Sequence, residues 1–293
     1  MARVGVYRSL EVEAVGEDEF VNKILWQGEK NLPLRSAYGG QVVGQALMAA
    51  CHTITDPELL LISAHCYFLS PVKTNERVTY RVTRTKDGRF FSSRSVQALQ
   101  GGKVVSHTIA SFKRLESNPH CLSHSPPGIP PGIFPPDDPR HDQEQLYFNN
   151  KLELSTSPFN AYYCFRKTDQ TKILAREPLP PKMLMWMKAR GEFPESCSLN
   201  EHRVALAFLS DFSMIYPLSL KYPEVKVGLR TSLDHSIWFH GPVYCGDTWF
   251  LMNIRCVQAG ESTTLNSGLM YSEDGTLVAT CQQQGLYRLN SKL

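Results

Sequence analysis

A carboxylate within an apolar run is the first sign of chemistry in this sequence. Asp211 lies in Val204–Ile215, VALAFLSDFSMI, where nearly every neighbour is apolar. Burying an ionised carboxylate without partners is costly, so the residue needs either hydrogen bonds or a task that repays the cost. Asp211 is either a structural acid bound to backbone or to an adjacent strand, or a general base that lines a dry, apolar channel. The second interpretation makes it the leading candidate for proton transfer.

Polar residues in two later segments could complete a site around that carboxylate. Ser232 opens a β-rich stretch that runs to His240. Alternation divides this stretch into two faces, one with Ser232, Asp234, Ser236 and Trp238 and the other with Leu233, His235, Ile237 and Phe239. Gln283 lies in the last predicted strand, on the face that also holds Leu277, Ala279 and Cys281. The run Gln282–Gln284 is also what an exposed edge strand would show.

Several other catalytic and metal-binding patterns do not fit. The segment Gly260–Thr264 stops short of the GxSxG motif of a nucleophile elbow. The adjacent residues at 234–236 have the letters of a Ser-His-Asp triad, but neighbours on a strand point to opposite faces. Most of the 9 histidines lack a metal-ligand spacing such as HExxH, and the sequence predicts neither a metal nor a cofactor. Three histidines are interpreted as structural or substrate-lining: His65, His235 and His240.

Two related halves flank a proline-rich segment. Glu116–Gln145 contains three Pro-Pro pairs, which forbid a helix and predict an extended connector. Strands are predicted in the first half at Arg77–Thr85, Phe90–Leu99 and Val104–Lys113, after the stretch Ser63–Val72. They are predicted in the second half at Trp249–Val257, Leu265–Tyr271 and Leu277–Arg288, after the stretch Ser232–Val243. Aligning Pro71 with Pro242 also brings Phe68 onto Phe239, which predicts an internal duplication.

Each half also has a predicted helix before its strands. The first covers Gly39–Cys51, where Gly40, Gly44 and Ala46 are small enough to let the helix lie close against a sheet. Its glycines match neither GxGxxG nor a Walker loop, so a phosphate-binding loop is not favoured. The second helix is predicted over Val204–Ile215, and both helices should be mostly buried.

Composition excludes several classes of protein. The chain has 293 residues, and its 31 Lys+Arg and 28 Asp+Glu give a formal charge of +3, too small a surplus to predict binding to nucleic acid or to an anionic membrane. No apolar run reaches the roughly 18 residues of a transmembrane helix. The 8 cysteines are scattered and form no CxxC pair, which favours free thiols in a reducing compartment.

The two ends of the chain carry information on location. The N-terminal residues lack the apolar core of a secretory signal. The last residues, Ser291, Lys292 and Leu293, match the strict C-terminal peroxisomal address, which an import receptor reads. The sequence therefore predicts a peroxisomal matrix protein.

These features together resemble the type II acyl-CoA thioesterases, from about Leu25 to Arg288. The most specific stretches are YGGQVVGQAL at Tyr38–Leu47, HCYF at His65–Phe68, FSSRSV at Phe91–Val96, LDHSIWFH at Leu233–His240 and DGTLVATCQQQGLYR at Asp274–Arg288. With the terminal tripeptide, the chain is most similar to the peroxisomal member of the family. The resemblance implies an α+β double hotdog fold, in which two tandem hotdog halves each wrap a long helix in an antiparallel sheet. We expect an N-terminal hotdog over residues 1–114, a connector over 115–158, a C-terminal hotdog over 159–290 and the targeting tripeptide at 291–293.

The resemblance also implies the site residues. The family combines an acid, a hydroxyl and a glutamine from the second half, which fall on Asp211, Ser232 and Gln283. Relatives usually read Gln-Glu-Gly where this chain reads Gln283-Gln284-Gly285. Asp211 would activate a water that Ser232 and Gln283 hold, and the Gln283 amide or a backbone N–H would stabilise the oxyanion. The first half should supply channel wall and coenzyme A contacts, for which the basic candidates are Arg35, Lys73 and Arg94.

The expected function is hydrolysis of acyl-CoA to a free acid and coenzyme A, by a homo-oligomer. A non-catalytic acyl-CoA-binding or scaffold protein is the main alternative, but such a protein does not need the acid, hydroxyl and amide together. A hotdog enoyl-CoA hydratase is less favoured, because it needs a histidine five residues after its acid. That position holds Tyr216 after Asp211 and Phe239 after Asp234.

Overall fold

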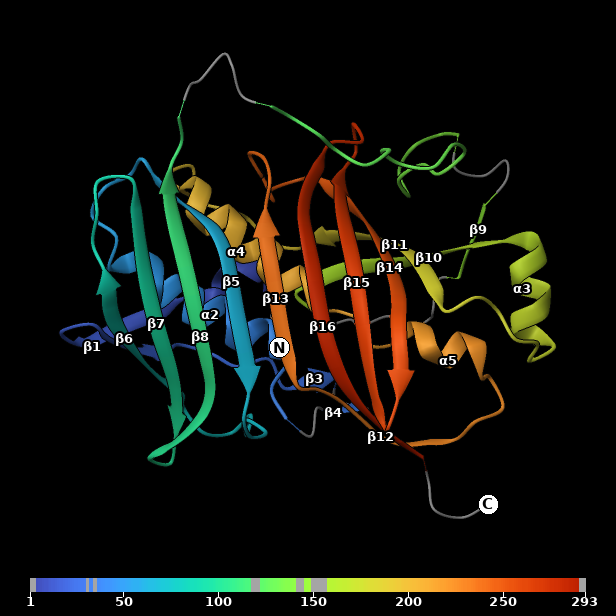
Figure 1. Cartoon of the computed structure of the whole chain (residues 1–293), viewed down its shortest axis with the longest axis horizontal. Helices are drawn as coiled ribbons and strands as arrows, with labels where there is room; N and C mark the ends of the chain where they lie inside the picture. Colours follow the sequence, from blue (N-terminus) through green and yellow to red (C-terminus); the bar gives the residue numbers. More distant parts are fainter. Residues whose placement is uncertain are drawn as a thin grey trace.

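One long antiparallel sheet runs through both halves of the chain (Figure 1). The computed structural model describes residues 4–29, 32–33, 36–116, 122–140, 145–148 and 157–289. In the first half the neighbouring strands are β1 (Val12–Gly16), β2 (Glu19–Asn22), β6 (Thr79–Lys86), β7 (Phe91–Gln100), β8 (Lys103–Arg114) and β5 (Leu59–Phe68). The order continues with β13 (Asp234–Phe239), β16 (Leu277–Leu289), β15 (Thr263–Ser272), β14 (Trp249–Gly260), β11 (Lys182–Ala189), β10 (Phe159–Arg166) and β9 (Gln145–Phe148). Strand β12 (Val227–Ser232) also pairs with β16, and β3 (Gly28–Glu29) and β4 (Leu32–Pro33) form a separate ribbon.

The two halves join where β5 pairs with β13. His65 lies opposite Ser236 in this antiparallel pair. The same sequence spacing separates Pro71 from Pro242 and His65 from Ser236, so each strand meets its own counterpart. This is the register of two copies related by a two-fold axis, and it supports the predicted duplication.

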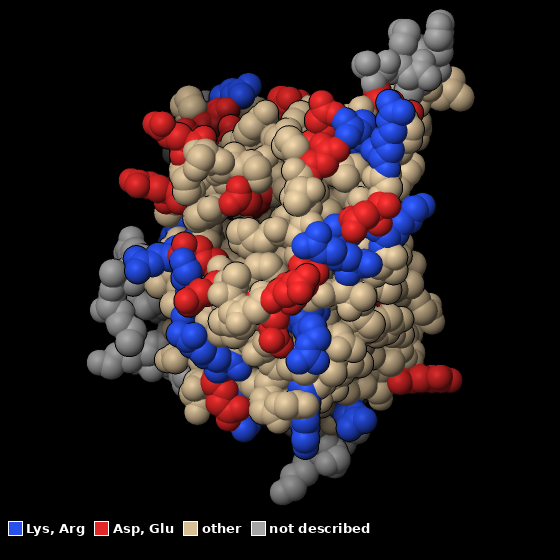
Figure 2. Space-filling model, turned by 90° about the vertical axis from the view of Figure 1, so that its left-hand side faces the viewer, with Lys and Arg blue, Asp and Glu red and all other residues tan. Residues whose placement is uncertain are grey.

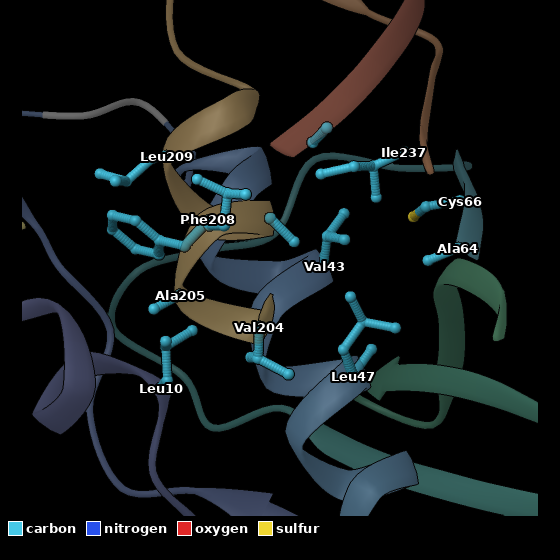
Figure 3. Packing of buried hydrophobic residues seen from close by; sticks show 14 of the residues in the cluster. Leu10, Val43, Leu47, Ala64, Cys66, Val204, Ala205, Phe208, Leu209 and Ile237 are labelled. Atoms are coloured by element: carbon cyan, nitrogen blue, oxygen red, sulfur yellow. The ribbon is translucent and has the colours of Figure 1, made fainter. Parts of the chain in front are cut away.

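Both long helices, α2 (Gly39–His52) and α4 (Leu199–Ser210), lie on the same face of the sheet (Figure 1). Figure 3 shows Val43 and Leu47 of α2, Phe208 of α4 and Ile237 of β13 packed in one apolar cluster. Each such side chain contributes about 1.5–3 kcal/mol when it leaves water, which makes this interior the main stabilising element. The other described helices are short: α1 (Val6–Leu10) and α5 (Pro217–Lys221), which add Leu10 and Leu220 to this cluster, and α3 (Lys167–Leu174).

Gly40 and Gly44 of α2 permit close contact with other helices rather than with the sheet, which corrects the expectation from sequence for these two residues. A Cβ on Gly40 would lie 2.4 Å from the carbonyl oxygen of Phe208 in α4, and one on Gly44 would lie 2.3 Å from Leu10 of α1. The Tyr38 hydroxyl donates to the same Phe208 carbonyl at 2.8 Å. The start of α2 is therefore held against the last turn of α4.

The predicted boundaries of the second helix, 204–215, are wrong at both ends. Helix α4 starts at Leu199 because Ser198 and Glu201 form a reciprocal capping box. It ends at Ser210, so Asp211 is the C-cap, and Ser213 follows with a φ of 61° that a helix cannot contain. Asp211 therefore lies at the end of the helix, where its side chain can reach the sheet.

The proline-rich connector packs on the second half. Residues 122–140 form neither helix nor strand. Trp249 Nε1 donates to Asp137 at 2.8 Å, the Tyr271 hydroxyl donates to the Pro127 carbonyl at 3.0 Å, and Ile129 packs near both rings. The range expected for the connector, 115–158, also contains strand β9, which pairs with β10.

Surface charge is mixed on the face shown in Figure 2, where basic and acidic side chains alternate. Among the exposed ion pairs of the first half, Arg84 pairs with Asp18 and Arg81 with Glu19. None of the helices in the described part of the chain combines the length and apolarity of a membrane span.

Candidate active site

The three predicted site residues are in direct contact. Gln283 Nε2 donates to Asp211 Oδ1 at 2.9 Å and also to the Ser232 hydroxyl oxygen. An amide nitrogen has two hydrogens, so this geometry uses both. Gln283 is 1% exposed and Asp211 8% exposed, which places the carboxylate at the edge of the apolar interior.

Strand β16 is central in the sheet, so the interpretation of its glutamine run as an exposed edge is wrong. It pairs with β15 on one side and with β13 and β12 on the other. Alternation within the strand turns Gln283 inward while Gln282 is exposed. A buried amide in the middle of a sheet needs side-chain partners, and the site supplies them.

Two local features bring Ser232 and Asp211 to Gln283. The chain passes from β12 to β13 at Leu233, whose N–H donates to the Gln284 carbonyl at 2.8 Å, and this contact holds Ser232 beside β16. Gly285 lies two residues beyond Gln283, and a Cβ there would lie 2.7 Å from Ile215. The glycine lets the segment after α4 rest on the strand, which brings the Asp211 carboxylate to the amide.

The first half contributes a backbone donor that sequence reasoning missed. The Gly40 N–H, in the first turn of α2, donates to Asp211 Oδ2 at 2.8 Å. The positive end of a helix dipole favours a negative charge at this place. Gly39 provides the room, since a Cβ there would lie 2.9 Å from Asp211 Oδ2 and 3.0 Å from Phe68. The only signal in the sequence was the Gly-Gly pair at the start of the predicted helix.

Tyr38 lies next to this contact. Burial, and then the negative charge of Asp211, raise the pKa of the Tyr38 hydroxyl well above its usual value. The hydroxyl therefore stays protonated and remains a donor to the Phe208 carbonyl.

His235 lies directly behind the glutamine. It is fully buried, its Nδ1 is 2.7 Å from Gln283 Oε1, and its Nε2 is 2.8 Å from the Ser210 hydroxyl oxygen. His65 and His240 lie elsewhere, where they contact Ser236 and Thr280. Within the described part of the chain, His235 is the one of these three histidines that contacts Asp211, Ser232 or Gln283.

The basic candidates for coenzyme A binding fare differently. Arg35 lies outside the described residues, as do Ser291–Leu293. Lys73 is exposed and pairs with Glu76 at 2.7 Å. Arg94 is 1% exposed, and its five N–H donors bind Thr53 twice, Lys86, Ser93 and Asp87. This corrects the expectation for Arg94, which caps the end of α2 and has no donor left for a substrate.

The described residues contain no group of three or more His, Cys, Asp or Glu side chains that could hold a metal ion.

Comparisons with known proteins show which family this chain resembles. Two family models match, the acyl-CoA thioesterase N-terminal domain at residues 30–113 and the acyl-CoA thioesterase C-terminal domain at residues 134–287. Acyl-coenzyme A thioesterase 8 of Homo sapiens is 30% identical, over 97% of this chain and 89% of the human protein. The peroxisomal acyl-coenzyme A thioester hydrolase 1 of Saccharomyces cerevisiae is 22% identical, over 97% of this chain and 95% of the yeast protein. The crystal structure of an acyl-CoA thioesterase II from Mycobacterium marinum matches with a TM-score of 0.75 and 27% identity, over 98% of this chain and all of that one.

Proposed function

Because this chain belongs to the type II acyl-CoA thioesterase family and has its double hotdog fold, we propose that it hydrolyses acyl-CoA thioesters to a carboxylic acid and coenzyme A. The observation that supports this most strongly is the hydrogen-bonded group of Asp211, Ser232 and Gln283, with the Gly40 N–H on the far carboxylate oxygen. It combines a fixed carboxylate with polar groups that can hold a water molecule.

The proposed reaction uses Asp211 as a general base. The oxygen of a water attacks the thioester carbonyl carbon while its proton moves to Asp211. The C–S bond then breaks, the electron pair stays on sulfur, and Asp211 returns the proton to the departing thiolate. A thiolate leaves easily, so this step needs no covalent enzyme intermediate, and a well-placed base contributes about 10²–10⁴-fold.

Ser232 and Gln283 hold the participants in place. Both amide hydrogens of Gln283 are used, on Asp211 and on Ser232. The Ser232 oxygen accepts one of them, so its own hydrogen is free to donate to the water or to the developing oxyanion. A donor at the oxyanion contributes about 10²–10³-fold.

The test is thiol release from a panel of acyl-CoA esters, with wild type compared with Asp211→Asn. The variant keeps the shape of the side chain and removes the base, so kcat should fall by at least about 10²-fold with little loss of thermal stability. Retention of most turnover would contradict the role of Asp211. No release by wild type from any ester would instead favour an acyl-CoA-binding protein.

Lys73 remains our proposed contact for the anionic part of coenzyme A. It follows Val72, whose carbonyl accepts the Ala37 N–H at 2.7 Å, close to the start of α2. Lys73→Ala should raise KM several-fold and leave kcat nearly unchanged, because an exposed cation acts on binding rather than on the reacting atoms.

We also propose that the enzyme works in the peroxisome matrix. The support is the terminal tripeptide and the likeness to a yeast protein named as peroxisomal. A fluorescent protein fused to the N-terminus should follow the chain into peroxisomes, and deletion of Ser291–Leu293 should leave the fusion in the cytosol. Continued import of the truncated fusion would point to a different signal.

A further inference from the structure

His235 is a buried polar side chain that the proposed reaction does not use. It lies on the inner face of β13, between Cys66 of the neighbouring β5 and Gln283 of β16. The adjacent inward positions of β13, Ile237 and Phe239, are apolar. An imidazole at a position suited to an aliphatic side chain needs a reason, because burying its polar atoms is costly without partners.

Its partners fix the proton on the ring. Gln283 donates through Nε2 to Asp211 and Ser232, so its carbonyl oxygen Oε1 faces His235 and can only accept. His235 Nδ1, at 2.7 Å, must therefore be the protonated nitrogen. Nε2 lies 2.8 Å from the Ser210 hydroxyl oxygen, whose single hydrogen can go either to this nitrogen or to the Ala207 carbonyl oxygen at 2.9 Å.

The side-chain amide of Gln283 can take two orientations of nearly equal shape, which exchange its nitrogen and its oxygen. In the one described, an N–H group faces the Asp211 carboxylate. Rotation by half a turn would set the amide oxygen against the carboxylate, two acceptors in contact, and would remove the donor to Ser232. When the Asp211 carboxylate takes a proton during the reaction, it can donate as well as accept, so it no longer selects the orientation with the amide nitrogen toward it. A donor behind the amide is needed to keep it in place.

We propose that His235 is a positioning residue, which holds Gln283 in the orientation that binds Asp211 and Ser232 and whose ring is itself held by the contact with Ser210. This inference rests on the proposed function. His235 touches neither the carboxylate nor the attacking water, and acts through the glutamine alone. Its loss should therefore lower kcat and leave KM nearly unchanged.

Two substitutions of His235, by asparagine and by glutamine, test whether the site needs a donor at the place of Nδ1 or merely a polar side chain. The amide nitrogen of asparagine can occupy the place of Nδ1, whereas that of glutamine reaches the place of Nε2. His235→Asn should keep the bond to Gln283 and retain kcat within about 3-fold, while His235→Gln should keep only the Ser210 contact and lose about 10- to 100-fold. Equal activities of the two variants would overturn the proposal.

A double-mutant cycle with Gln283→Ala gives the second readout. If His235 acts only through Gln283, then His235→Gln should cause no further fall in kcat once the glutamine is gone. A further fall of the same size as in the wild-type background would mean a purely structural role. If both His235 variants fail to fold, Ser210→Ala leaves the ring in place and decides the question on the same criterion, with an expected several-fold fall that disappears in the Gln283→Ala background.

The controls separate this inference from the proposed function. Turnover by wild type and its loss in Asp211→Asn establish the reaction before the His235 series is read. His240→Gln is the matched control, since its ring is exposed and contacts Thr280 at the far end of the same strand. It should have wild-type kcat and KM, and thermal unfolding of every variant identifies losses that come from folding.

Discussion

At the residue scale, each N–H donor of the site has one specific acceptor. Gln283 gives both amide hydrogens away, Ser232 receives one of them, and Asp211 receives the other on Oδ1 while Gly40 donates to Oδ2. Because Ser232 accepts from the amide, its hydroxyl hydrogen is the mobile element of the group. The hydroxyl therefore matters as a donor, and the identity of the carbon skeleton that carries it matters less.

Substitutions of Ser232 test whether its hydroxyl acts as a donor. Ser232→Thr keeps the hydroxyl and should retain activity within about 3-fold, whereas Ser232→Ala should lower kcat by about 10-fold or more, since it removes one donor and leaves an amide hydrogen of Gln283 without its acceptor. Steady-state thiol release, with KM and kcat measured separately, gives the result. An alanine variant as active as the threonine variant would mean that the hydroxyl plays no part in the chemistry.

The buried cysteines give a second prediction at this scale. Burial raises the pKa of the thiols of Cys66, Cys164 and Cys281 to about 12 and that of Cys245 higher still. A raised pKa keeps the thiol protonated at neutral pH, and the protonated form is a poor nucleophile. Iodoacetamide at pH about 7.5 should leave these residues unmodified in the native enzyme and modify them after denaturation, as mass spectrometry would detect. Rapid native labelling of Cys281, which lies two residues before Gln283 in β16, would mean that the interior opens on the timescale of the reaction.

The residues of the site differ in how far sequence could predict them. Asp211 was conspicuous because a charge in an apolar run must be compensated, and Ser232 and Gln283 came from family motifs. Gly40 acts through its backbone N–H, which every residue except proline has, so its letter carries no sign of the role. His235 was recognised as inward-facing by alternation, but its role depends on its register with Gln283, which only the pairing of distant strands decides.

At the element scale, the site depends on how one helix ends and another begins. The prediction of a helix over 204–215 rests on the run of apolar residues. This run continues past Ser210, where α4 ends, and includes Met214, which is buried. After Ser210 the chain stays buried but is no longer helical, since it turns at Ser213 and keeps its apolar residues inside without helical hydrogen bonds. The apolar pattern alone could not reveal that change, yet it is what frees the Asp211 side chain to meet the sheet and the N-terminus of α2.

The contact between α2 and Asp211 can be tested at Gly39. A Cβ added at Gly39 would lie 2.9 Å from Asp211 Oδ2 and should displace the carboxylate by a few tenths of an ångström. We expect Gly39→Ala to lower kcat by about 10-fold or more, because a small misplacement of a reacting group is costly. Gly241→Ala is the matched control, since a Cβ there meets nothing within 4 Å. If the two alanine variants have equal kcat, the position of α2 does not control the carboxylate.

At the scale of the whole molecule, the duplication explains why one chain needs both halves for one site. All three polar side chains come from the second half, but Asp211 takes its second hydrogen bond from Gly40 in the first. Strand β13, next to Gln283, has β5 of the first half as its other neighbour. The first half is therefore a structural partner in the reaction centre.

This arrangement predicts the behaviour of the chain when it is divided in the connector, between residues 116 and 117. The second fragment alone retains Asp211, Ser232 and Gln283, but it would expose β13 as an unpaired edge and Phe208 of α4 to water, and Asp211 would lose the Gly40 donor. We expect it to be inactive and prone to aggregation.

Co-expression with the first fragment should restore a complex with most of the wild-type activity, because the β5–β13 pair and the packed helices re-form without a covalent link. Size-exclusion chromatography and thiol release measure both outcomes, and the same pair with Asp211→Asn in the second fragment should assemble but stay inactive. Wild-type turnover by the second fragment alone would refute the role given to the first half, since that fragment lacks the Gly40 donor at the start of α2.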